Sequence, residues 1–220
     1  HWIQSEPLDD RIGDLVVEGI DAAPDADLAF SGLDASVAGE VEADWARRGY
    51  AVVSNARNYR MDPTVPLLIP EVNADHIALI DRQDWRGADG QPSGGFIVTN
   101  PNCSTVGLVM ALKPLHDAFG VEAAHVVTMQ ALSGTLGSTG EVVEAEAVVS
   151  AQCNRVPVMD GHMEAVSVRL AGSPSAADVA DALRSWESPL AGRDLPTAPA
   201  TPLLVTDDPT APQPRTHVHL

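Results

Sequence analysis

The residues of this sequence that are best suited to chemistry surround a cysteine. Cys103 lies in the run Asn-Pro-Asn-Cys-Ser-Thr (100–105), between a β-favouring stretch at 96–99 and an apolar helical stretch at 106–112. Pro114 is expected to end that helix, because proline lacks the backbone N–H. The first N–H groups of a helix have no internal partner and carry partial positive charge, which stabilises a thiolate. Cys103 is therefore a candidate nucleophile. The alternative is a cysteine that is buried as a small apolar side chain and takes no part in a reaction.

A second group of candidate residues lies further along the chain, around a histidine. His162 follows Asp-Gly, which favours a turn, so we expect it to begin a new strand and to serve as a general acid or base near neutral pH. Arg155 lies in an apolar strand beside Cys153 and needs an anionic partner there, such as a substrate carboxylate. A structural histidine and an internal salt bridge are the alternatives, and the residues alone leave them open. Cys153 does not begin a helix, so we expect it to be the less reactive thiol.

The first half of the sequence predicts the sheet that would carry Cys103. Strands are expected at residues 14–17, 27–31 and 50–54, with a helix over 34–48 between the last two. Val37, Val41 and Trp45, together with Ala38, recur at helical spacing and are expected to lie on one face of the helix. Strand, helix and strand joined by short links favour parallel pairing, as in the later part of a Rossmann-type sheet.

The second half of the sequence predicts a different architecture. Strands are expected at 125–130 and 165–170, followed by a helix that opens at 173–175, has Asp178 in a capping box and ends near Trp186. Val166, Val168 and Leu170 alternate with polar residues and predict an apolar sheet face open to a partner. The fold class is therefore α/β, a partial Rossmann-type parallel sheet followed by an α+β catalytic and dimerisation domain. The expected divisions are a partial NAD(P)-binding domain at 1–102, the catalytic and dimerisation domain at 103–200, and an irregular tail at 201–220.

The composition argues against several classes of partner. The chain has 220 residues and a formal net charge of −18, and Lys113 is its only lysine. Such an acidic surface repels nucleic acid and anionic membranes, and it suits a halophilic protein because salt screens self-repulsion. The sequence shows no secretory leader and no apolar stretch of membrane length, and its two cysteines fit free thiols, so we expect a cytoplasmic protein. His217 and His219 alone do not make a metal site, so no metal is assigned.

Four segments, in order, resemble the aspartate-semialdehyde dehydrogenases of the archaeal and fungal type. These segments are residues 54–73, the run at 100–105, Thr-Met-Gln-Ala-Leu-Ser-Gly at 128–134, and 153–164. The resemblance implies a cysteine that forms a thiohemiacetal and a thioester, with hydride passed to NADP or NAD and with phosphate as a second substrate. In the biosynthetic direction, aspartyl phosphate becomes aspartate semialdehyde on the route to lysine, threonine and methionine.

The resemblance also implies roles for individual residues. Cys103 would be the nucleophile, His162 the acid or base, and Gln130 the residue that orients the substrate. Arg155 would bind the substrate carboxylate, Arg60 the phosphate, and Asn102 would frame the oxyanion. The residues implied for cofactor binding are Ser31, Asn55, Ser133 and Gly134. The implied partners are a small acidic substrate, phosphate and a second copy of the chain, as a homodimer or a higher homo-oligomer.

Two departures from the family pattern predict a truncated and internally deleted member. The family's Gly-x-x-Gly-x-x-Gly loop, which holds the cofactor pyrophosphate at a helix N-terminus, has no match at the start of the chain. Gly134, Gly137 and Gly140 have that spacing in the wrong part of the chain, and residues 135–152 are too few for the family's segment there. Little dehydrogenase activity is therefore expected. Two alternatives stay open, a related acyl-phosphate or acyl-CoA reductase such as a malonyl-CoA reductase-like enzyme, and a non-catalytic dimerising remnant.

Overall fold

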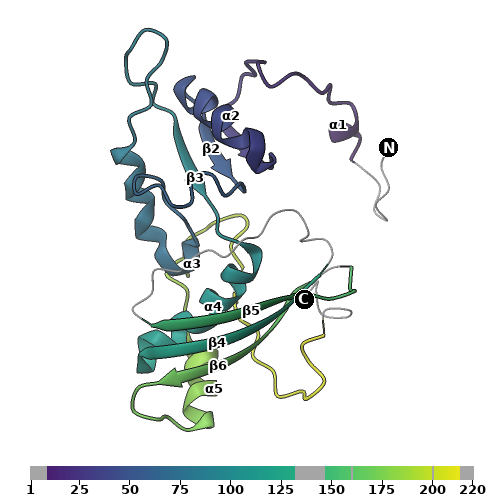
Figure 1. Cartoon of the computed structure of the whole chain (residues 1–220), viewed down its shortest axis with the longest axis vertical. Helices are drawn as coiled ribbons and strands as arrows, with labels where there is room; N and C mark the ends of the chain where they lie inside the picture. The colour runs from purple at the N-terminus through teal and green to yellow at the C-terminus, as the bar shows by residue number, and fades with distance from the viewer. Residues whose placement is uncertain (1–8, 132–146, 160, 200, 214–220) are drawn as a thin grey trace.

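A parallel three-stranded sheet forms the upper part of the molecule (Figure 1). The computed structural model describes residues 9–131, 147–159, 161–199 and 201–213. The strands, in sheet order, are β1 (Leu28–Ser31), β2 (Ala51–Ser54) and β3 (Phe96–Thr99). Both strand pairs are parallel, as the sequence predicts. The carboxyl ends of all three strands therefore meet at one edge, which is where ligands bind in open α/β sheets.

The predicted strand at residues 14–17 is wrong, because this segment has no strand partner among the described residues. A short helix α1 (Asp10–Gly13) precedes it, and Leu15, Val16 and Val17 are exposed. The segment that follows is fastened to the rest of the molecule by polar contacts instead. The Trp45 indole donates to the carbonyl of Ile20, and the Tyr50 hydroxyl donates to that of Pro24. The apolar run at 14–17 thus has the composition of a strand without the neighbour that a strand needs.

Helix α2 (Ala35–Arg47) connects β1 to β2, and its predicted bounds are confirmed. Asp34 caps it by accepting a hydrogen bond from the Ser36 amide at 2.9 Å. The predicted face is only partly buried, since Val37 is 49% exposed. The side chains that α2 buries are Ala38, Glu42, Ala43 and Ala46. Small residues at these positions let the helix approach the sheet closely, and they enclose one carboxylate.

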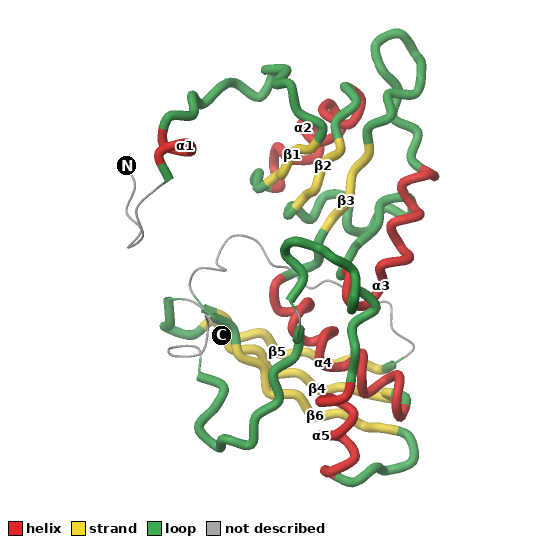
Figure 2. Tube along the Cα trace, turned by 180° about the vertical axis from the view of Figure 1, so that it is seen from behind, coloured by secondary structure: helices red, strands yellow, loops and turns green. Residues whose placement is uncertain are grey.

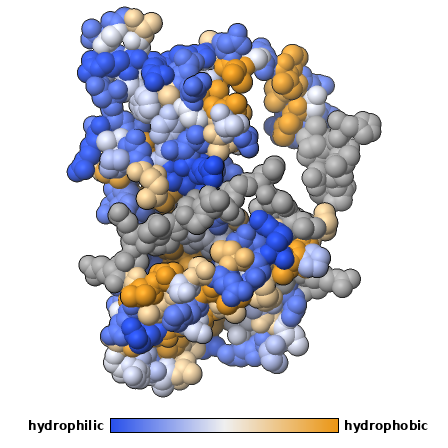
Figure 3. All heavy atoms as spheres, in the orientation of Figure 1, coloured by the Kyte–Doolittle hydropathy of each residue, from blue (hydrophilic) through white to orange (hydrophobic). Residues whose placement is uncertain are grey.

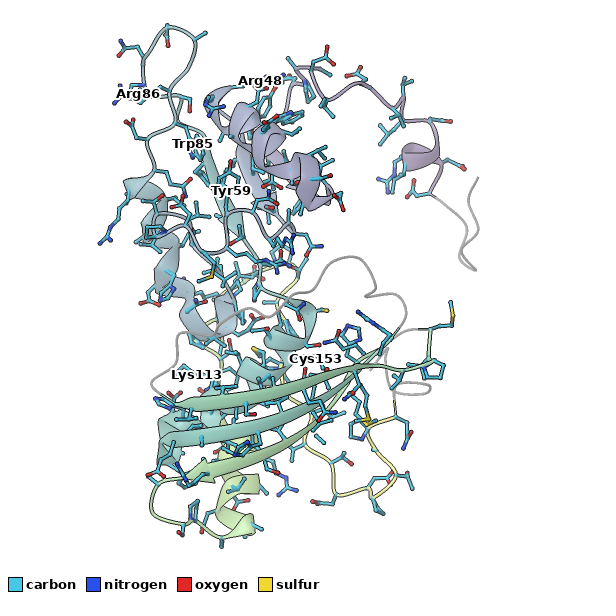
Figure 4. The ribbon with its side chains drawn as sticks, viewed as in Figure 1. Arg48, Tyr59, Trp85, Arg86, Lys113 and Cys153 are labelled. Atoms are coloured by element: carbon cyan, nitrogen blue, oxygen red, sulfur yellow. The ribbon has the colours of Figure 1, made fainter. Side chains whose placement is uncertain are left out.

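The core under this sheet combines aliphatic and aromatic side chains. Ala46, Val52, Val65 and Ile97 are buried together, and Trp45, Tyr50, Tyr59 and Trp85 pack around them. The rings of Tyr59 and Trp85 meet edge to face with centroids 6.1 Å apart, and both side chains are labelled in Figure 4. Gly95 allows the close approach of α2, because a Cβ there would stand 2.1 Å from the Ala46 carbonyl oxygen. Two short helices, α3 (Pro70–Asn73) and the 3₁₀ helix η1 (Ala74–Arg82), cross between β2 and β3.

Helix α4 (Cys103–Phe119) joins the two parts of the molecule and is longer than predicted. The expectation that Pro114 ends this helix is wrong, because Pro114 lies inside it and is buried. Proline costs the helix one backbone hydrogen bond. The helix continues because its apolar side chains pack on the second sheet, where Leu108 and Leu112 contact Ala124 and Val126. Tertiary packing therefore outweighs the local preference.

The second sheet is mixed and lies in the lower part of the molecule (Figures 1 and 2). Its order is β5 (Val148–Arg155), β4 (Val121–Gln130) and β6 (Met163–Leu170). β5 runs parallel to β4, and β6 runs antiparallel to it. Helix α5 (Ala176–Ser185) packs against α4 and begins with the predicted capping box between Ser175 and Asp178. Figure 2 shows α4 and α5 on one side of this sheet.

The side of the second sheet that faces away from α4 carries apolar residues other than the predicted ones. Val166 and Val168 pair in register with the buried residues Val126 and Ala124, so they face α4. The prediction that they form an open face is therefore wrong. Val127 and Val148 are 40% and 68% exposed. Figure 3 shows hydrophobic residues gathered on the lower part of the molecule, where this sheet is turned to the viewer.

Candidate active site

Cys103 occupies the first position of α4, as the sequence predicts. Strand β3 ends at Thr99, and Asn102 caps the helix by accepting a hydrogen bond from the Ser104 amide at 2.9 Å. The thiol is exposed and lies among helix N–H groups that have no partner within the helix. The positive end of the helix dipole favours the thiolate at this point. A Cys103 nucleophile is thus physically well founded.

His162 lies directly beside the thiol, although 58 residues separate the two in sequence. Its Nε2 is 3.1 Å from Cys103 Sγ, and its Nδ1 accepts a hydrogen bond from the Ala131 amide at 3.1 Å. His162 precedes β6, which begins at Met163, so the predicted position at the start of a strand is confirmed. Because β6 is antiparallel to β4, its first residue meets the last residues of β4. This topology brings the imidazole to the thiol.

Arg60 approaches the same thiol from the loop after β2. One guanidinium nitrogen, Nη2, donates to the Asn55 carbonyl at 3.0 Å. Burial lowers the pKa of Arg60, and the nearby negative charge of Cys103 opposes this lowering. Arg60 is therefore a half-buried cation beside the nucleophile, which is a suitable position for contact with an anionic substrate group.

Gln130 and Arg155 lie side by side at the ends of β4 and β5, where their Cα atoms are in register. Gln130 is buried, and Arg155 Nη1 donates to the Ala131 carbonyl at 2.7 Å. This contact is to a backbone carbonyl directly after β4, and the anionic partner expected for Arg155 stays a prediction. The structure thus brings both residues to the neighbourhood of His162 through Ala131.

A cavity of about 340 Å³ opens between α4 and β6 beside the nucleophile. Its lining residues are Cys103, Ser104, Gly107, Leu108, Ala111, His162, Glu164 and Val166. Burial raises the pKa of Glu164, and the Ser104 hydroxyl partly offsets this effect. The sequence analysis missed Glu164. Its spacing of two residues from His162 was the available signal, because alternate residues of a strand share a face.

The other predicted residues lie at the carboxyl edge of the first sheet. Ser31 ends β1, and Asn55 follows β2. Asn100 follows β3 and donates from its side-chain amide to the Asn55 side chain at 3.0 Å. Ser133 and Gly134 lie outside the described residues. The edge therefore presents a polar row that leads from Ser31 towards Cys103.

Glu42 accepts hydrogen bonds from side chains at this edge of the sheet, and the sequence analysis missed it as well. The hydroxyls of Ser31 and Ser54 donate to its Oε1 at 2.5 and 2.6 Å. The second oxygen, Oε2, is buried and has no hydrogen-bond partner among the described residues. No pattern in the sequence marks this residue, because a carboxylate on the buried face of a helix contradicts the usual hydrophobic spacing.

The described residues fit one end of a dinucleotide cofactor. The hydrogen of the Ser31 hydroxyl is engaged by Glu42, so the oxygen lone pairs remain for a donor, and the space beside Gly32 is open. Asn55 and Asn100 add amide groups next to the segment that leads to Cys103. This polar edge suits the nicotinamide and ribose end of such a cofactor. No described helix begins with a Gly-x-x-Gly-x-x-Gly loop for a pyrophosphate.

The part of the chain that the structure describes has neither a metal-binding cluster nor a membrane-spanning helix. Its histidine, cysteine and acidic side chains form no group of three or more that could hold a metal ion, and His217 and His219 lie outside it. None of its helices is both long and apolar enough to cross a membrane. Cys153, labelled in Figure 4, is exposed on β5. Its predicted place in a strand is correct, but exposure does not distinguish it from Cys103.

Comparison with known proteins places these features in a family. A family model for the semialdehyde dehydrogenase NAD binding domain matches residues 5–80, and one for the semialdehyde dehydrogenase dimerisation domain matches residues 136–220. The aspartate-semialdehyde dehydrogenase of Candida albicans is 37% identical over 263 residues, covering 97% of this chain and 72% of that protein. The aspartate-semialdehyde dehydrogenase of Archaeoglobus fulgidus is 40% identical over 250 residues, with 97% and 70% covered.

Structural similarity agrees with the sequence comparison. The crystal structure of the Candida albicans aspartate-semialdehyde dehydrogenase with NADP superimposes with a TM-score of 0.82, over 98% of this chain and 72% of that one. The Vibrio cholerae aspartate-semialdehyde dehydrogenase II, at 24% identity and a TM-score of 0.58 over 71% of this chain and 59% of that one, shares the fold. The α/β architecture, with its Rossmann-like first part, is confirmed. The chain therefore belongs to the aspartate-semialdehyde dehydrogenase family.

Proposed function

We propose that this chain acts as an NADP-dependent aspartate-semialdehyde dehydrogenase, which converts aspartyl phosphate to aspartate semialdehyde in lysine, threonine and methionine biosynthesis. The observation that carries this proposal is the 3.1 Å contact between Cys103 Sγ and His162 Nε2 at the start of α4. A thiolate at a helix N-terminus, with an imidazole in contact, is an activated nucleophile for an acyl group. Family membership supplies the substrate class.

The first half-reaction follows from the residues around the thiol. The Cys103 thiolate attacks the carbonyl carbon of the acyl phosphate, the bond from carbon to the phosphate oxygen breaks, and inorganic phosphate leaves with the electron pair. Asn102 frames the oxyanion, and Arg60 contacts the phosphate. This assignment is supported by the half-buried position of Arg60 beside Cys103. The product is a thioester on Cys103.

The second half-reaction needs a hydride, which NADPH supplies when it is bound. Ser31, Asn55 and the Asn100 segment would hold its nicotinamide end, as their position at the carboxyl edge supports. His162 would donate a hydrogen bond from Nε2 to the oxyanion that hydride addition leaves on the thioester carbon, and the carbon–sulfur bond would then break to give the aldehyde and the Cys103 thiolate. Arg155 holds the substrate carboxylate and Gln130 orients the substrate, a proposal supported by their adjacent positions at the strand ends.

The thioester half-reaction can be tested without any cofactor. Aspartyl phosphate mixed with the protein should release one phosphate per chain and leave an acyl group on Cys103, detected by intact-mass and peptide mass spectrometry. Cys103→Ser should abolish the adduct, and Cys153→Ser should leave it unchanged. Acylation of Cys153, or no adduct in folded protein, would contradict the proposal and favour the non-catalytic alternative. Faster acylation by malonyl-CoA would favour the related acyl-CoA reductases.

We further propose that a segment after residue 134 is shortened relative to the family. The alignment with the Candida albicans relative runs over 263 residues, whereas this whole chain has 220, so the relative has residues between the aligned ends without a counterpart here. This difference supports an internal deletion. Since the missing segment should help hold phosphate and substrate, we expect acylation to need a higher concentration of aspartyl phosphate for half-saturation than in the Candida albicans relative. A half-saturating concentration equal to that of the relative would contradict the deletion proposal.

Assembly and salt dependence complete the proposal. The match of residues 136–220 to a dimerisation domain supports a homodimer, with the open side of the second sheet as its interface.

The net charge of −18 supports function at high salt. The melting temperature should rise by several degrees between dilute buffer and molar KCl, because salt screens the repulsion among carboxylates. An unchanged melting temperature would contradict adaptation to salt.

A further inference from the structure

The two ring nitrogens of His162 have partners of different kinds. Nδ1 lies 3.1 Å from the backbone nitrogen of Ala131, which can only donate, and Nε2 lies 3.1 Å from Cys103 Sγ. Nδ1 must therefore carry a lone pair. The single proton of the neutral ring is then on Nε2 and points at the sulfur. His162 faces Cys103 as a hydrogen-bond donor.

The Ala131 N–H beside Nδ1 is compatible with some protonation states of Cys103 and His162 and excludes others. An imidazolium has an N–H at Nδ1, which would point at the Ala131 N–H. A thiol that donates to Nε2 would need the neutral ring to carry its proton on Nδ1, which leads to the same conflict. A neutral ring with its proton on Nε2 meets no such conflict, whether the sulfur is a thiolate or a thiol. In the thiol form, the S–H hydrogen can point at Asn102 Oδ1, 3.9 Å from the sulfur. The thiol proton therefore leaves to solvent when Cys103 ionises, rather than moving to His162.

The charges around the sulfur agree with this assignment. Arg60 provides a cation from the loop after β2, and the N-terminus of α4 adds partial positive charge. Glu164, the charged side chain that β6 contributes to the cavity, has its pKa raised by burial, which disfavours a second negative charge there. The thiolate thus has compensating charge without a protonated His162. Arg155 adds a further cation at the end of β5.

Strand β5 holds the Ala131 amide in the orientation that this arrangement needs. The peptide between Gln130 and Ala131 is planar and trans, so the Gln130 carbonyl and the Ala131 N–H point in opposite directions. The Val156 amide donates to the Gln130 carbonyl at 3.0 Å, which aims the Ala131 N–H away from β5 and towards His162. Arg155 Nη1 donates to the Ala131 carbonyl at 2.7 Å and fixes the other side of this fully buried residue.

We infer that Arg155 is a positioning residue which, through Ala131, holds His162 in the tautomer protonated at Nε2, so that His162 stabilises the Cys103 thiolate by donating a hydrogen bond. The inference deepens the proposed function and rests on it for the role of Cys103 as the nucleophile. The guanidinium carries five N–H donors in a planar fork. A contact of Nη1 with Ala131 is therefore compatible with a substrate carboxylate on other donors of the same side chain.

Nitrogen NMR of the full chain labelled with ¹⁵N-histidine tests the tautomer directly. The His162 signals are assigned by their loss in His162→Gln, and the Cys103 thiol is titrated in parallel by its ultraviolet thiolate absorbance. We expect a protonated Nε2 and an unprotonated Nδ1 on both sides of the thiol titration. An imidazolium that titrates together with the thiol, or a ring protonated at Nδ1, would overturn the inference.

Substitution of the arginine tests its part in the arrangement. Arg155→Met keeps roughly the length of the side chain but removes its donors. It should mix the His162 tautomers and slow iodoacetamide alkylation of Cys103 at pH 7 about tenfold, because the thiolate loses a hydrogen bond that stabilises it. Arg155→Lys keeps a donor and should restore most of the rate. Cys153 provides an internal reference in each sample, because it is exposed on β5 near the substitution.

Arg169→Met is the matched control, because Arg169 is an exposed arginine of the same sheet that pairs with Glu122 at 3.1 Å. It should leave both the tautomer and the alkylation rate unchanged. An Arg155→Met protein that folds but keeps the wild-type tautomer and rate would overturn the inference, and a role for Arg155 in substrate binding alone predicts that outcome. Neither readout involves aspartyl phosphate, so failure here is distinguishable from failure of the proposed function.

Discussion

The two sheets of this molecule place functional groups by different means. In the first sheet all strands are parallel, so the polar residues that follow them gather at one edge without any long-range reversal of the chain. In the second sheet the site forms where the end of β4 meets the start of the antiparallel strand β6. The first arrangement produces an extended polar row that suits a long cofactor. The second concentrates a thiol, an imidazole and a backbone donor at one point.

The two sheets also differ in how they treat polar groups and exposed faces. The first encloses a carboxylate, Glu42, and satisfies two serine hydroxyls with it. The second covers one face with α4 and leaves apolar side chains such as Val127 and Val148 exposed on the other. The first sheet thus pairs serine hydroxyls with a buried carboxylate, whereas the second has an apolar surface that a second copy of the chain would bury.

The largest effect is expected at the point of convergence in the second sheet. His162→Ala removes the hydrogen-bond donor beside the thiolate and the substrate oxyanion, and it should slow acylation of Cys103 by aspartyl phosphate by about 10²–10³-fold. His125→Ala is the matched control, because His125 is an exposed histidine of β4. Rapid-mixing measurement of phosphate release gives both rates. If the two variants slow the reaction equally, the contact between His162 and Cys103 has no catalytic role.

The next largest effect is expected beneath the first sheet. Glu42→Ala leaves two serine hydroxyls without their acceptor and should lower the free energy of unfolding by about 3 kcal/mol, since each buried unsatisfied group costs about 1–3 kcal/mol. Glu42→Gln keeps an acceptor oxygen and should cost less than about 1 kcal/mol. Urea unfolding in molar KCl measures both variants.

Glu122→Ala is the control for this carboxylate in the second sheet. Glu122 pairs with Arg169 at the surface, so its removal should change the free energy of unfolding by less than about 1 kcal/mol. If Glu42→Ala and Glu122→Ala lower the free energy of unfolding by similar amounts, the contrast between an enclosed and an exposed carboxylate is wrong.

The contrast also explains which features could be predicted from the sequence. The strands of the first sheet are short apolar runs between breakers, and the capping box of α5 is a local signal, so both were predictable. Cys103 and His162 could be named from motifs that resemble a family. Their 3.1 Å contact depends on the antiparallel pairing of β6, which no local pattern encodes.

The incorrect predictions share a physical cause, which is that tertiary contacts outweigh local preference. Pro114 continues a helix because its neighbours pack on β4, and Glu42 is buried because two serines donate to it. Residues 14–17 have the composition of a strand but lack a partner among the described residues. The apolar alternation of β6 was read as an open face, although either face of a strand shows the same period.

A smaller effect is expected at the open side of the second sheet. Val127→Asp puts a charge into an apolar surface and should weaken a homodimer by about 2 kcal/mol, which is a roughly 30-fold rise in its dissociation constant. Light scattering at high salt should show about twice the 23.1 kDa chain mass for the wild type and a shift towards one chain for the variant. Phe30→Asp is the control, because Phe30 is 80% exposed on the first sheet. Dissociation by Phe30→Asp alone would move the interface to β1.

The smallest effect concerns the carboxyl group in the cavity beside the nucleophile, and its sign can be worked out. Burial raises the pKa of Glu164 above its ordinary 4.5, so the folded protein binds this proton more tightly than the unfolded chain does. Stability therefore falls as pH rises through the unfolded pKa, and the loss becomes constant above the folded pKa. Glu164→Gln removes this penalty.

The Glu164→Gln variant should gain stability over wild type between about pH 5 and pH 8, by less than about 1 kcal/mol because the carboxyl group remains partly exposed to solvent. This range lies above the sequence pI of about 4.5, so precipitation is avoided. Urea unfolding at several pH values in molar KCl measures the difference, and Glu122→Gln should show no such growth because Glu122 is exposed beside Arg169. A Glu164→Gln protein that is less stable than wild type at pH 8 would mean that the ionised carboxylate has a stabilising partner in the cavity. In that case the charge near Cys103 would be more negative than we infer, and the thiolate would depend more strongly on Arg60.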